Sequence, residues 1–281
     1  MSSSTNKSSQ GSSEGSSVKP GDRASIIQLQ KVSKSFPGRG AAVEVLRNVS
    51  LSVDENTFVS IVGPSGCGKT TLLNLVAGFL APSQGSIHVR GTLVHGINSD
   101  LGLGYITQDN RLFPWLTLAG NVEFPLRARR VPKENRRDKV ANLLEMVGLK
   151  GFEEHYPYEL SGGMQKRTAL AQALSYDPDV LLMDEPFGSL DAQTRMLLQQ
   201  ELLKIWKRTG KTILFVTHDI VEALALSDRV VVMSRRPGSI KGQLEVNLSR
   251  PRDVFHIHDH DGYGDCYRAL WHLLRSELPE H

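Results

Sequence analysis

The stretch GPSGCGKTT, residues 63–71, follows directly on the apolar run FVSIV, residues 58–62. It holds three glycines and a lysine, although a tight turn needs only one glycine. The segment from Gly63 to Thr70 fits the spacing G-x-x-x-x-G-K-[ST]. The apolar run before it and TLLNLVAGFL after it supply the strand, loop and helix that this motif requires. We therefore predict a loop that wraps around phosphate groups, in preference to an accidental glycine-rich turn.

Each residue type in this loop has a physical reason to be there. Glycines let backbone N–H groups turn toward an anion without interference from Cβ, and the following helix directs its positive end at the same phosphates. Lys69 can reach the β- and γ-phosphates, and the Thr70 hydroxyl can bind Mg²⁺. Alone, the loop indicates only a nucleoside triphosphate or a similar phosphate compound. The predicted cofactor-binding residues here are Gly63, Pro64, Ser65, Gly66, Cys67, Gly68, Lys69, Thr70 and Thr71.

A second acidic element follows later in the chain. The apolar run VLLMD, residues 180–184, ends in Asp184 and is followed by Glu185. A carboxylate there lies at the C-terminal edge of a parallel sheet, where open α/β folds bind ligands. Asp184 suits the coordination shell of Mg²⁺, directly or through water, and Glu185 is placed to polarise an attacking water. A solvated acidic strand end is the alternative, and the phosphate loop upstream favours the catalytic interpretation.

The segment LSGGMQKR, residues 160–167, predicts a second anion site on a different element. Ser161 is a suitable N-cap, and Gly162 and Gly163 leave their N–H groups accessible at the start of a helix. A chain with two separate phosphate-binding elements suggests head-to-tail pairing. The second element of one copy would then complete the nucleotide pocket of its partner across a two-fold axis.

In this order, the motifs from residue 26 to about 235 resemble the ATP-binding subunits of ABC transporters. The resemblance implies ATP hydrolysis with ATP and Mg²⁺ as cofactors. It implies that Phe36 stacks on adenine, that Gln108 in GYITQDN contacts Mg²⁺ and the attacking water, and that His218 in FVTHD contacts the γ-phosphate. It also implies that the segment 189–191 touches the opposite subunit.

The resemblance completes the set of predicted site residues. The predicted catalytic residues are Lys69, Gln108, Glu185 and His218, and the predicted Mg²⁺ ligands are Thr70, Gln108 and Asp184. The remaining predicted nucleotide contacts are Phe36, Ser161, Gly162, Gly163, Gln165 and Asp191.

Hydrophobic periodicity predicts strands alternating with helices, and hence an α/β fold with a mostly parallel sheet. The predicted strands are 58–62, 180–184, 212–216 and 229–233, and the predicted helices include 71–80, 136–149, 192–208 and 219–227. The resemblance implies a P-loop NTPase core with an antiparallel β subdomain and a helical subdomain at about 110–175. We expect a disordered Ser-rich tail over 1–24, the cassette over 25–250 and a C-terminal helical extension over 251–281.

Composition narrows the class of protein. A formal net charge of +3 over 281 residues is too small to indicate nucleic acid as the main partner. Two cysteines form no disulfide framework, which suggests a reducing cytoplasm, and no apolar run approaches the roughly 18 residues of a membrane span. The polar N-terminus does not have the apolar core of a secretory signal.

Local segments indicate a branch of the family. The stretches 112–129, 184–195 and 233–240 resemble the nitrate, sulfonate, taurine and bicarbonate importer ATPases. The resemblance implies a second ATP-binding subunit, an integral membrane permease and, indirectly, a periplasmic or extracellular solute-binding protein, with no nucleic acid. It places the chain peripherally at the cytoplasmic face of the inner membrane. The alternative is a soluble ABC-superfamily ATPase in regulation or nucleic-acid repair. A P-loop kinase or GTPase is disfavoured by LSGGMQ, and a non-hydrolysing scaffold by Lys69, Glu185 and His218.

Each of two further segments can be interpreted as a binding site or as an ordinary solvated part of the structure. In HIHDHDGYGDC, residues 256–266, three alternating histidines would share one face of a strand and suit Zn²⁺ or Ni²⁺. A polar, solvated connection to a terminal helix is the favoured interpretation. The basic run 127–139 is interpreted as a solvated helix face rather than a nucleic-acid patch, because it contains no interleaved aromatic residues.

Overall fold

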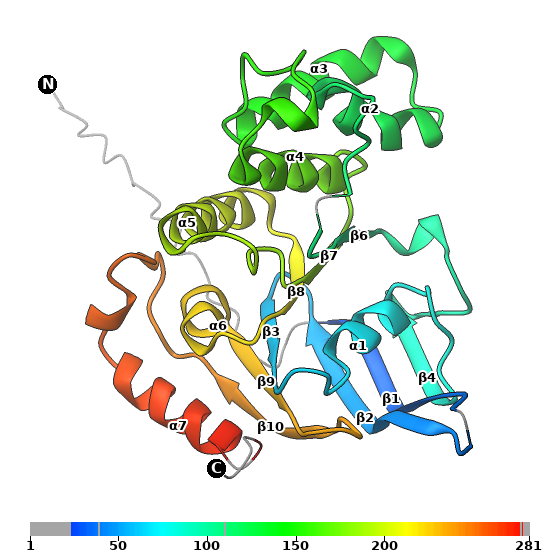
Figure 1. Ribbon diagram of the computed structural model, residues 1–281, viewed down its shortest axis with the longest axis vertical. Helices are drawn as coiled ribbons and strands as arrows, with labels where there is room; N and C mark the ends of the chain where they lie inside the picture. The colour runs from blue at the N-terminus through cyan, green and yellow to red at the C-terminus, as the bar shows by residue number, and fades with distance from the viewer. Residues whose placement is uncertain (1–23, 39, 110, 276, 278–281) are drawn as a thin grey trace, which may run out of the picture.

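The computed structural model describes residues 24–38, 40–109, 111–275 and 277 (Figure 1). The predicted tail, residues 1–24, lies outside these ranges except for its last residue. The central element is a six-stranded sheet in the order β10-β9-β3-β8-β7-β6. All neighbours in it are parallel except β10, which runs antiparallel to β9. Its strands are β3 (Phe58–Val62), β6 (Leu103–Ile106), β7 (Val180–Asp184), β8 (Thr212–Val216), β9 (Arg229–Met233) and β10 (Ile240–Glu245).

A smaller antiparallel sheet, in the order β2-β1-β4-β5, lies on one side of the central sheet. Between the two sheets lies α1 (Lys69–Val76), the helix that starts at the glycine loop (Figure 1). Its buried Leu72 and Leu73 share one hydrophobic core with Val59 and Ile61 of β3. The small-sheet strands are β1 (Ser25–Phe36), β2 (Val43–Asp54), β4 (Gln84–Val89) and β5 (Thr92–Leu93).

The other face of the central sheet is covered by α5 (Ala192–Thr209), α6 (Ile220–Leu226) and α7 (Tyr263–Arg275). Because side chains alternate along a strand, Phe58 and Val62 point to this second core, while Val59 and Ile61 point to the first. The central strands are therefore apolar on both faces. This explains why β3, β7 and β8 are mostly apolar in the sequence and show no alternation of polar and apolar residues.

A separate group of helices is inserted between β6 and β7, at the top of Figure 1. It consists of α2 (Leu118–Ala128), α3 (Lys133–Met146) and α4 (Gly162–Leu174). The buried residues of α3 are Val140, Leu143 and Leu144, which the helical spacing had identified. Short 3₁₀ turns complete the chain at Ser99–Leu101, Pro157–Glu159 and Ile257–Asp259.

The fold prediction is confirmed, and the predicted strands 58–62, 180–184, 212–216 and 229–233 match β3, β7, β8 and β9 residue for residue. The strands β6 and β10 of the same sheet were not predicted. The glycine-loop helix is shorter than predicted, ending at Val76 rather than near residue 80. Gly78 adopts φ +76°, and a Cβ on it would lie 2.2 Å from the carbonyl oxygen of Gly96. The helix ends at this left-handed glycine, where Phe79 N donates to Asn74 O at 2.9 Å and closes the last turn. Hydrophobicity alone does not predict this end. Among the described residues, none of the helices has the length and apolar character that a bilayer crossing demands.

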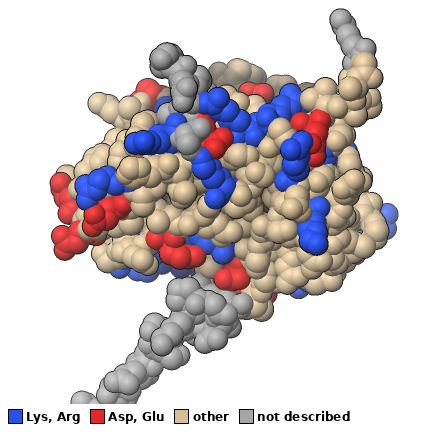
Figure 2. Space-filling model, turned by 90° about the horizontal axis from the view of Figure 1, so that it is seen from below, with Lys and Arg blue, Asp and Glu red and all other residues tan. Residues whose placement is uncertain are grey.

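Charged side chains on the face seen from below are of mixed sign. Figure 2 shows Lys and Arg side chains gathered toward the upper part of that view, with Asp and Glu side chains among them. A nucleic-acid surface is typically an uninterrupted basic stripe. This face does not have that character.

Candidate nucleotide-binding site

The glycine loop between β3 and α1 adopts a conformation that side chains would obstruct. Gly66 and Gly68 have φ values of +74° and +107°, which favour glycine. A Cβ on Gly68 would lie 2.7 Å from Cδ2 of Leu46, and one on Gly63 would lie 2.9 Å from the carbonyl oxygen of Met233. Backbone N–H groups at the start of a helix bind anions, so the loop fits the phosphate groups of a nucleotide.

Lys69 lies within the loop with its ammonium group directed at the loop backbone. Its Nζ donates to the carbonyl oxygens of Gly63 at 2.9 Å and Pro64 at 3.1 Å. Only 6% of the residue is exposed. An ammonium group carries three donors, so this arrangement holds the charge at the loop and leaves donor capacity for a phosphate oxygen.

Cys67 is packed beneath the loop. It is 1% exposed, and burial raises the pKa of its thiol. The residue packs with Leu46 and Val45 of β2 in the hydrophobic core between the two sheets. Its side chain therefore packs the loop from below, and only its backbone is available to a nucleotide.

Asp184, at the end of β7, faces the start of α1. The Thr70 hydroxyl donates to Asp184 Oδ1 at 3.0 Å. Burial, reinforced by the neighbouring Glu185, raises the pKa of Asp184 above its usual range, although Thr70 and Lys69 act in the opposite direction. A carboxylate and a hydroxyl in contact are hard oxygen ligands of the type that Mg²⁺ prefers, so the pair fits this ion.

Glu185 and His218 form a second pair beside the loop. His218 Nδ1 lies 2.9 Å from Glu185 Oε2. Glu185 has a positive φ of +44°, which is uncommon for a residue with a side chain, and its N–H donates to Val216 O at 3.0 Å. Strained backbone of this kind clusters at functional sites, because the surrounding structure must hold it in place.

Gln108 follows β6 and approaches this pair from the other side. An added Cβ on Gly188 would lie 3.8 Å from both Gln108 Nε2 and Glu185 Oε2, so both side chains lie near Gly188. The Gln108 carbonyl oxygen accepts a hydrogen bond from Lys166 of α4. Gln108 thus links the inserted helices to the acidic strand end.

A cavity of about 520 Å³ opens over the loop. Among the predicted residues it is lined by Phe36, Ser65, Gly66, Gly68, Lys69, Thr70, Thr71 and Glu185. Phe36 is part of this lining, with Lys34 Nζ 5.1 Å from the centre of its ring. A cavity lined by an aromatic ring and a phosphate loop fits the base and the phosphates of one nucleotide. Sequence reasoning missed Pro37, Val43, Val45 and Arg236, which also line it, because no motif spacing marks them.

The LSGG segment begins α4, and its residues do not line this cavity. Ser161 Oγ accepts from Met164 N at 3.3 Å, which confirms it as the N-cap. The α4 start packs instead on the segment after β7: an added Cβ on Gly162 would lie 3.5 Å from Leu190, and one on Gly163 3.1 Å from Thr194. The two predicted phosphate sites are therefore on separate surfaces of the chain.

Two other predicted nucleotide contacts have structural partners within the chain. Gln165 Nε2 donates to Pro157 O at 2.8 Å and so holds the loop before LSGGMQ, residues 160–165, which is called the signature below. Asp191 caps α5 by accepting from Thr194 N at 3.0 Å, and this contact lowers its pKa.

The histidine-rich segment is a turn and a 3₁₀ helix, not the strand that would align its imidazoles. His256 Nδ1 lies 2.8 Å from Asp253 Oδ2, and His258 packs edge-on against Tyr263 at 4.8 Å. Across the part of the chain that the structure describes, no three His, Cys, Asp or Glu side chains are grouped to hold a metal ion.

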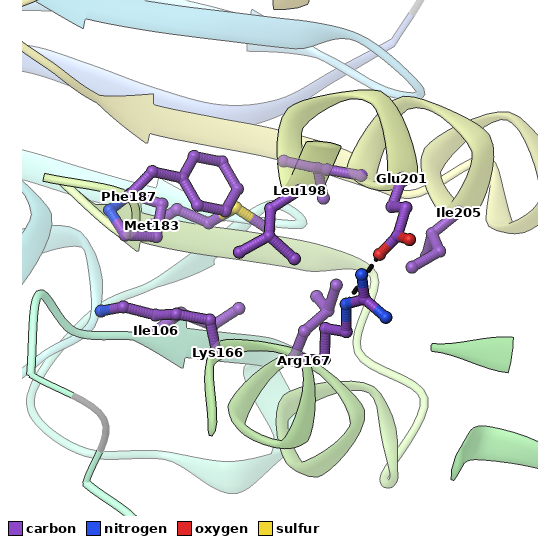
Figure 3. A pocket seen from close by; sticks show the side chains of 11 residues that line it. Ile106, Lys166, Arg167, Met183, Phe187, Leu198, Glu201 and Ile205 are labelled. Atoms are coloured by element: carbon purple, nitrogen blue, oxygen red, sulfur yellow. Dashed lines mark ion pairs between the residues drawn. The ribbon is translucent and has the colours of Figure 1, made fainter. Parts of the chain in front are cut away.

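A second, much smaller cavity of about 30 Å³ lies between α4 and α5 (Figure 3). Apolar side chains such as Met183, Phe187 and Leu198 form most of its lining. Arg167 of α4 and Glu201 of α5 point toward one another across it, with Nε and Oε2 2.9 Å apart. It is too small for a nucleotide, and its ion pair ties the signature helix to α5.

Comparison with known proteins agrees with this geometry. The ABC transporter family matches residues 46–188, from β2 through the acidic strand end. The chain belongs to the ABC transporter family. It is accordingly an ATP-binding ATPase.

Individual relatives narrow the comparison within this ABC ATPase family. The chain is 48% identical to an uncharacterized ABC transporter ATP-binding protein of Methanocaldococcus jannaschii, over 93% of this chain and 96% of the relative. It is 44% identical to the taurine import ATP-binding protein TauB of Ruegeria pomeroyi, over 88% of this chain and 93% of TauB. It is 46% identical to the aliphatic sulfonates import ATP-binding protein SsuB of Bacillus anthracis, over 81% of this chain and 88% of SsuB.

The fold of this ABC ATPase is similar to those of solved ATP-binding cassettes. A dimeric ATP-binding cassette in a post-hydrolysis state, bound to ADP and Pi, superimposes with a TM-score of 0.70 at 32% identity. The match covers 79% of this chain and 99% of that structure.

Proposed function

We propose that this ABC ATPase is the ATP-hydrolysing subunit of an importer for a small anion, of the taurine or aliphatic sulfonate type, which enters through a separate membrane permease. The names of the relatives support this proposal. The sequence resemblance also extends to nitrate and bicarbonate importers. The subunit would act peripherally at the cytoplasmic face of the inner membrane, with a solute-binding protein outside delivering the anion.

Within each subunit, the residues of the chain would divide the chemistry among them. Lys69 and the loop N–H groups would bind the β- and γ-phosphates, and Thr70 and Asp184 would hold Mg²⁺, which when bound neutralises phosphate charge. Glu185 would accept the proton of the attacking water, and His218, in contact with Glu185, would orient the γ-phosphate. Gln108 would approach the same water from the inserted helices.

One observation supports the mechanism: the glycine loop and the start of α4, the two elements proposed to bind phosphate, lie apart in one chain, and the α4 start does not line the cavity over the loop. Two copies paired head to tail would bring the loop of one subunit onto Ser161–Gln165 of the other. Each nucleotide would then be bound by both subunits, and hydrolysis would release them. The dimeric form of the related cassette structures supports this pairing.

A groove of about 980 Å³ between the core and the inserted helices supports a permease partner. Its lining includes Phe79 and Phe124, which are 51% and 43% exposed, and Arg111 and Arg129. Exposed aromatic side chains in a groove mark a protein contact, and such a groove fits an amphipathic helix from a membrane subunit. Gln108 lies at the junction that would couple this contact to the nucleotide.

The pairing is tested with Ser161→Arg in a Glu185→Gln chain, in which ATP is retained. ATP should drive the Glu185→Gln chain into dimers by light scattering, whereas the doubly substituted chain should bind ATP and stay monomeric. Glu134→Arg, on the exposed surface of α3, is the control and should pair normally. Unchanged pairing with Ser161→Arg would contradict the proposal. Co-purification with an integral membrane protein separates an importer subunit from a soluble regulatory or repair ATPase.

A further inference from the structure

The inference concerns how His218 is held, and it rests on the function proposed above. His218 lies in the short connection between β8 and α6, and 59% of its side chain is exposed. Its contact with Glu185 orients the imidazole ring, but that contact does not hold the backbone of the connection between β8 and α6 in place. Two polar ties from α5 reach this connection.

The first tie is Arg195 of α5 to Asp219, the residue after His218. Asp219 Oδ1 caps α6 by accepting from the N–H groups of Val221 at 2.8 Å and Glu222 at 3.2 Å. Its other oxygen lies 3.8 Å from Arg195 Nη1. A second nitrogen of the same guanidinium, Nη2, donates to the carbonyl oxygen of Leu190 at 2.9 Å. Arg195 therefore joins the connection between β8 and α6, which carries His218, to the segment 189–191.

The second tie lies one turn further along both helices and is buried. Gln199 Nε2 donates to Glu222 Oε1 at 2.8 Å. The other oxygen of Glu222 accepts from the Thr217 hydroxyl, which in turn accepts from Asp219 N at 3.0 Å. Thr217 and Asp219 flank His218, so this network holds both sides of the histidine. Gln199 and Glu222 are 4% and 7% exposed, where broken hydrogen bonds are costly.

The spacing of these ties makes them a unit. Arg195 and Gln199 are four residues apart on α5, and Asp219 and Glu222 are three apart at the start of α6, so each pair lies on one helix face. We propose that Arg195 and Gln199 are positioning residues for His218, and that Arg195 couples the histidine to the segment 189–191. Movement of that segment against a partner subunit would thus move His218 relative to Glu185.

The same contacts would be present if Arg195 and Gln199 only stabilised the fold. The test must therefore measure the environment of the His218 ring directly. We would record ¹H–¹⁵N spectra of the histidine rings in the full chain and assign His218 by its absence in His218→Ala. Arg195→Met should shift the His218 ring signals, and Arg195→Lys, which keeps the charge near Asp219, should shift them less. Arg208→Met removes the same charge at the exposed far end of α5 and should leave them unchanged.

Kinetics supply the second readout. Arg195→Met should lower kcat about tenfold while the KM for ATP changes by less than about twofold, because Lys69 and Thr70 are untouched. In a His218→Ala background, under single-turnover conditions, Arg195→Met should have no further effect, since both changes act through one residue. Gln199→Met should behave in the same way, with exposed Gln193→Met as its control.

The outcomes separate this inference from the proposed function. Unshifted His218 signals in Arg195→Met, or an equal fold loss of rate in both backgrounds, would overturn the positioning role. Full ATPase activity of His218→Ala would instead remove His218 from the reaction, and the positioning role with it. If Gln199→Met does not fold, the Arg195 variants still test the positioning role, because the ion pair of Arg195 with Asp219 is partly exposed.

Discussion

At the residue scale, the acidic end of β7 divides two tasks between adjacent carboxylates. Asp184 is buried and bonded to Thr70, whereas Glu185 is more accessible and bonded to His218. The two carboxylates therefore have different partners, although they are adjacent in the sequence. Two adjacent acids can therefore serve a metal ion and a water molecule separately.

Glu185→Gln tests the assignment of the general base. The amide keeps the shape of the side chain but cannot accept a proton, so ATP binding should persist while turnover falls by about 10²-fold or more. ATP affinity by calorimetry and steady-state phosphate release measure the two effects. Multiple turnovers at the unmodified rate would exclude Glu185 as the base.

Asp184→Asn tests the cost of a buried carboxylate. Because burial raises the pKa of Asp184 in the folded chain, the folded state binds the proton more tightly than the unfolded chain does. Stability should therefore fall as the pH rises from the ordinary aspartate pKa through the raised one. Without nucleotide and Mg²⁺ at pH 7, Asp184→Asn should melt higher by about 2–4 °C, with a smaller gain near pH 4.

The result would be informative in either direction. The substitution preserves an acceptor for Thr70 but removes a charge that would bind Mg²⁺, so stabilisation should accompany loss of Mg²⁺-dependent hydrolysis. Scanning calorimetry at both pH values measures the first effect. A lower melting temperature at pH 7 would indicate that Lys69 already compensates the charge.

At the element scale, α2 carries a residue that organises the groove. Asn121 is fully buried and bonds both backbone groups of Phe113 and the carbonyl oxygens of Leu116 and Thr117. These bonds shape the turn before α2, which presents the aromatic side chains of the groove. An asparagine in this position acts as a template for the loop.

Asn121→Ala should loosen that turn. It leaves buried backbone groups without partners, which costs about 1–3 kcal/mol, and should speed proteolysis near residues 113–117. Capture of the permease should weaken, while ATP binding to the single chain stays unchanged. Exposed Asn135→Ala on α3 is the control. Equal cleavage rates in the two variants would contradict a template role for Asn121.

The same elements indicate what sequence could and could not predict. The strands β3, β7 and β8 were predicted residue for residue, because strands buried on both faces are mostly apolar along their whole length. The glycine loop and the N-cap Ser161 follow from spacing alone. The strands of the small sheet and α2, which contains Pro125, were not located by periodicity, because their patterns are irregular and register shifts interrupt β1.

The site shows a similar division. Lys69, Thr70 and Glu185 are brought together because they follow β3 and β7, two parallel strands of one sheet whose carboxyl ends lie at the same edge, with β8 between them. A sequence pattern can predict this arrangement. Arg195, Gln199 and Glu222 were missed, since their contacts depend on how α5 and α6 lie side by side on the sheet. No local signal encodes that packing.

At the scale of the whole molecule, two distant surfaces of one chain would serve different nucleotides. A chain with Lys69→Ala has a damaged loop, and one with Ser161→Arg has a damaged signature helix. Each homodimer would have both sites damaged. A mixed dimer would combine the intact loop of one chain with the intact signature of the other.

Mixing the two inactive variants should therefore restore ATPase activity. Each mixed dimer has one of its two sites intact, so a mixed dimer should hydrolyse ATP at about half the rate of an unmodified dimer if the sites act independently. Adding Ser161→Arg chains to more Ser161→Arg chains is the control. A mixture as inactive as its components would contradict sites shared between chains.

The thiol under the phosphate loop has a practical consequence for following this enzyme in solution. Cys67 is enclosed and its thiol has a raised pKa, whereas Cys266 on α7 is only partly covered. A maleimide should therefore label Cys266 first, and Cys67 only in the brief intervals when the loop lifts from the sheet. The slow labelling phase would give the opening frequency of the empty loop, and its suppression by ATP would report nucleotide occupancy without any radioactive or fluorescent substrate.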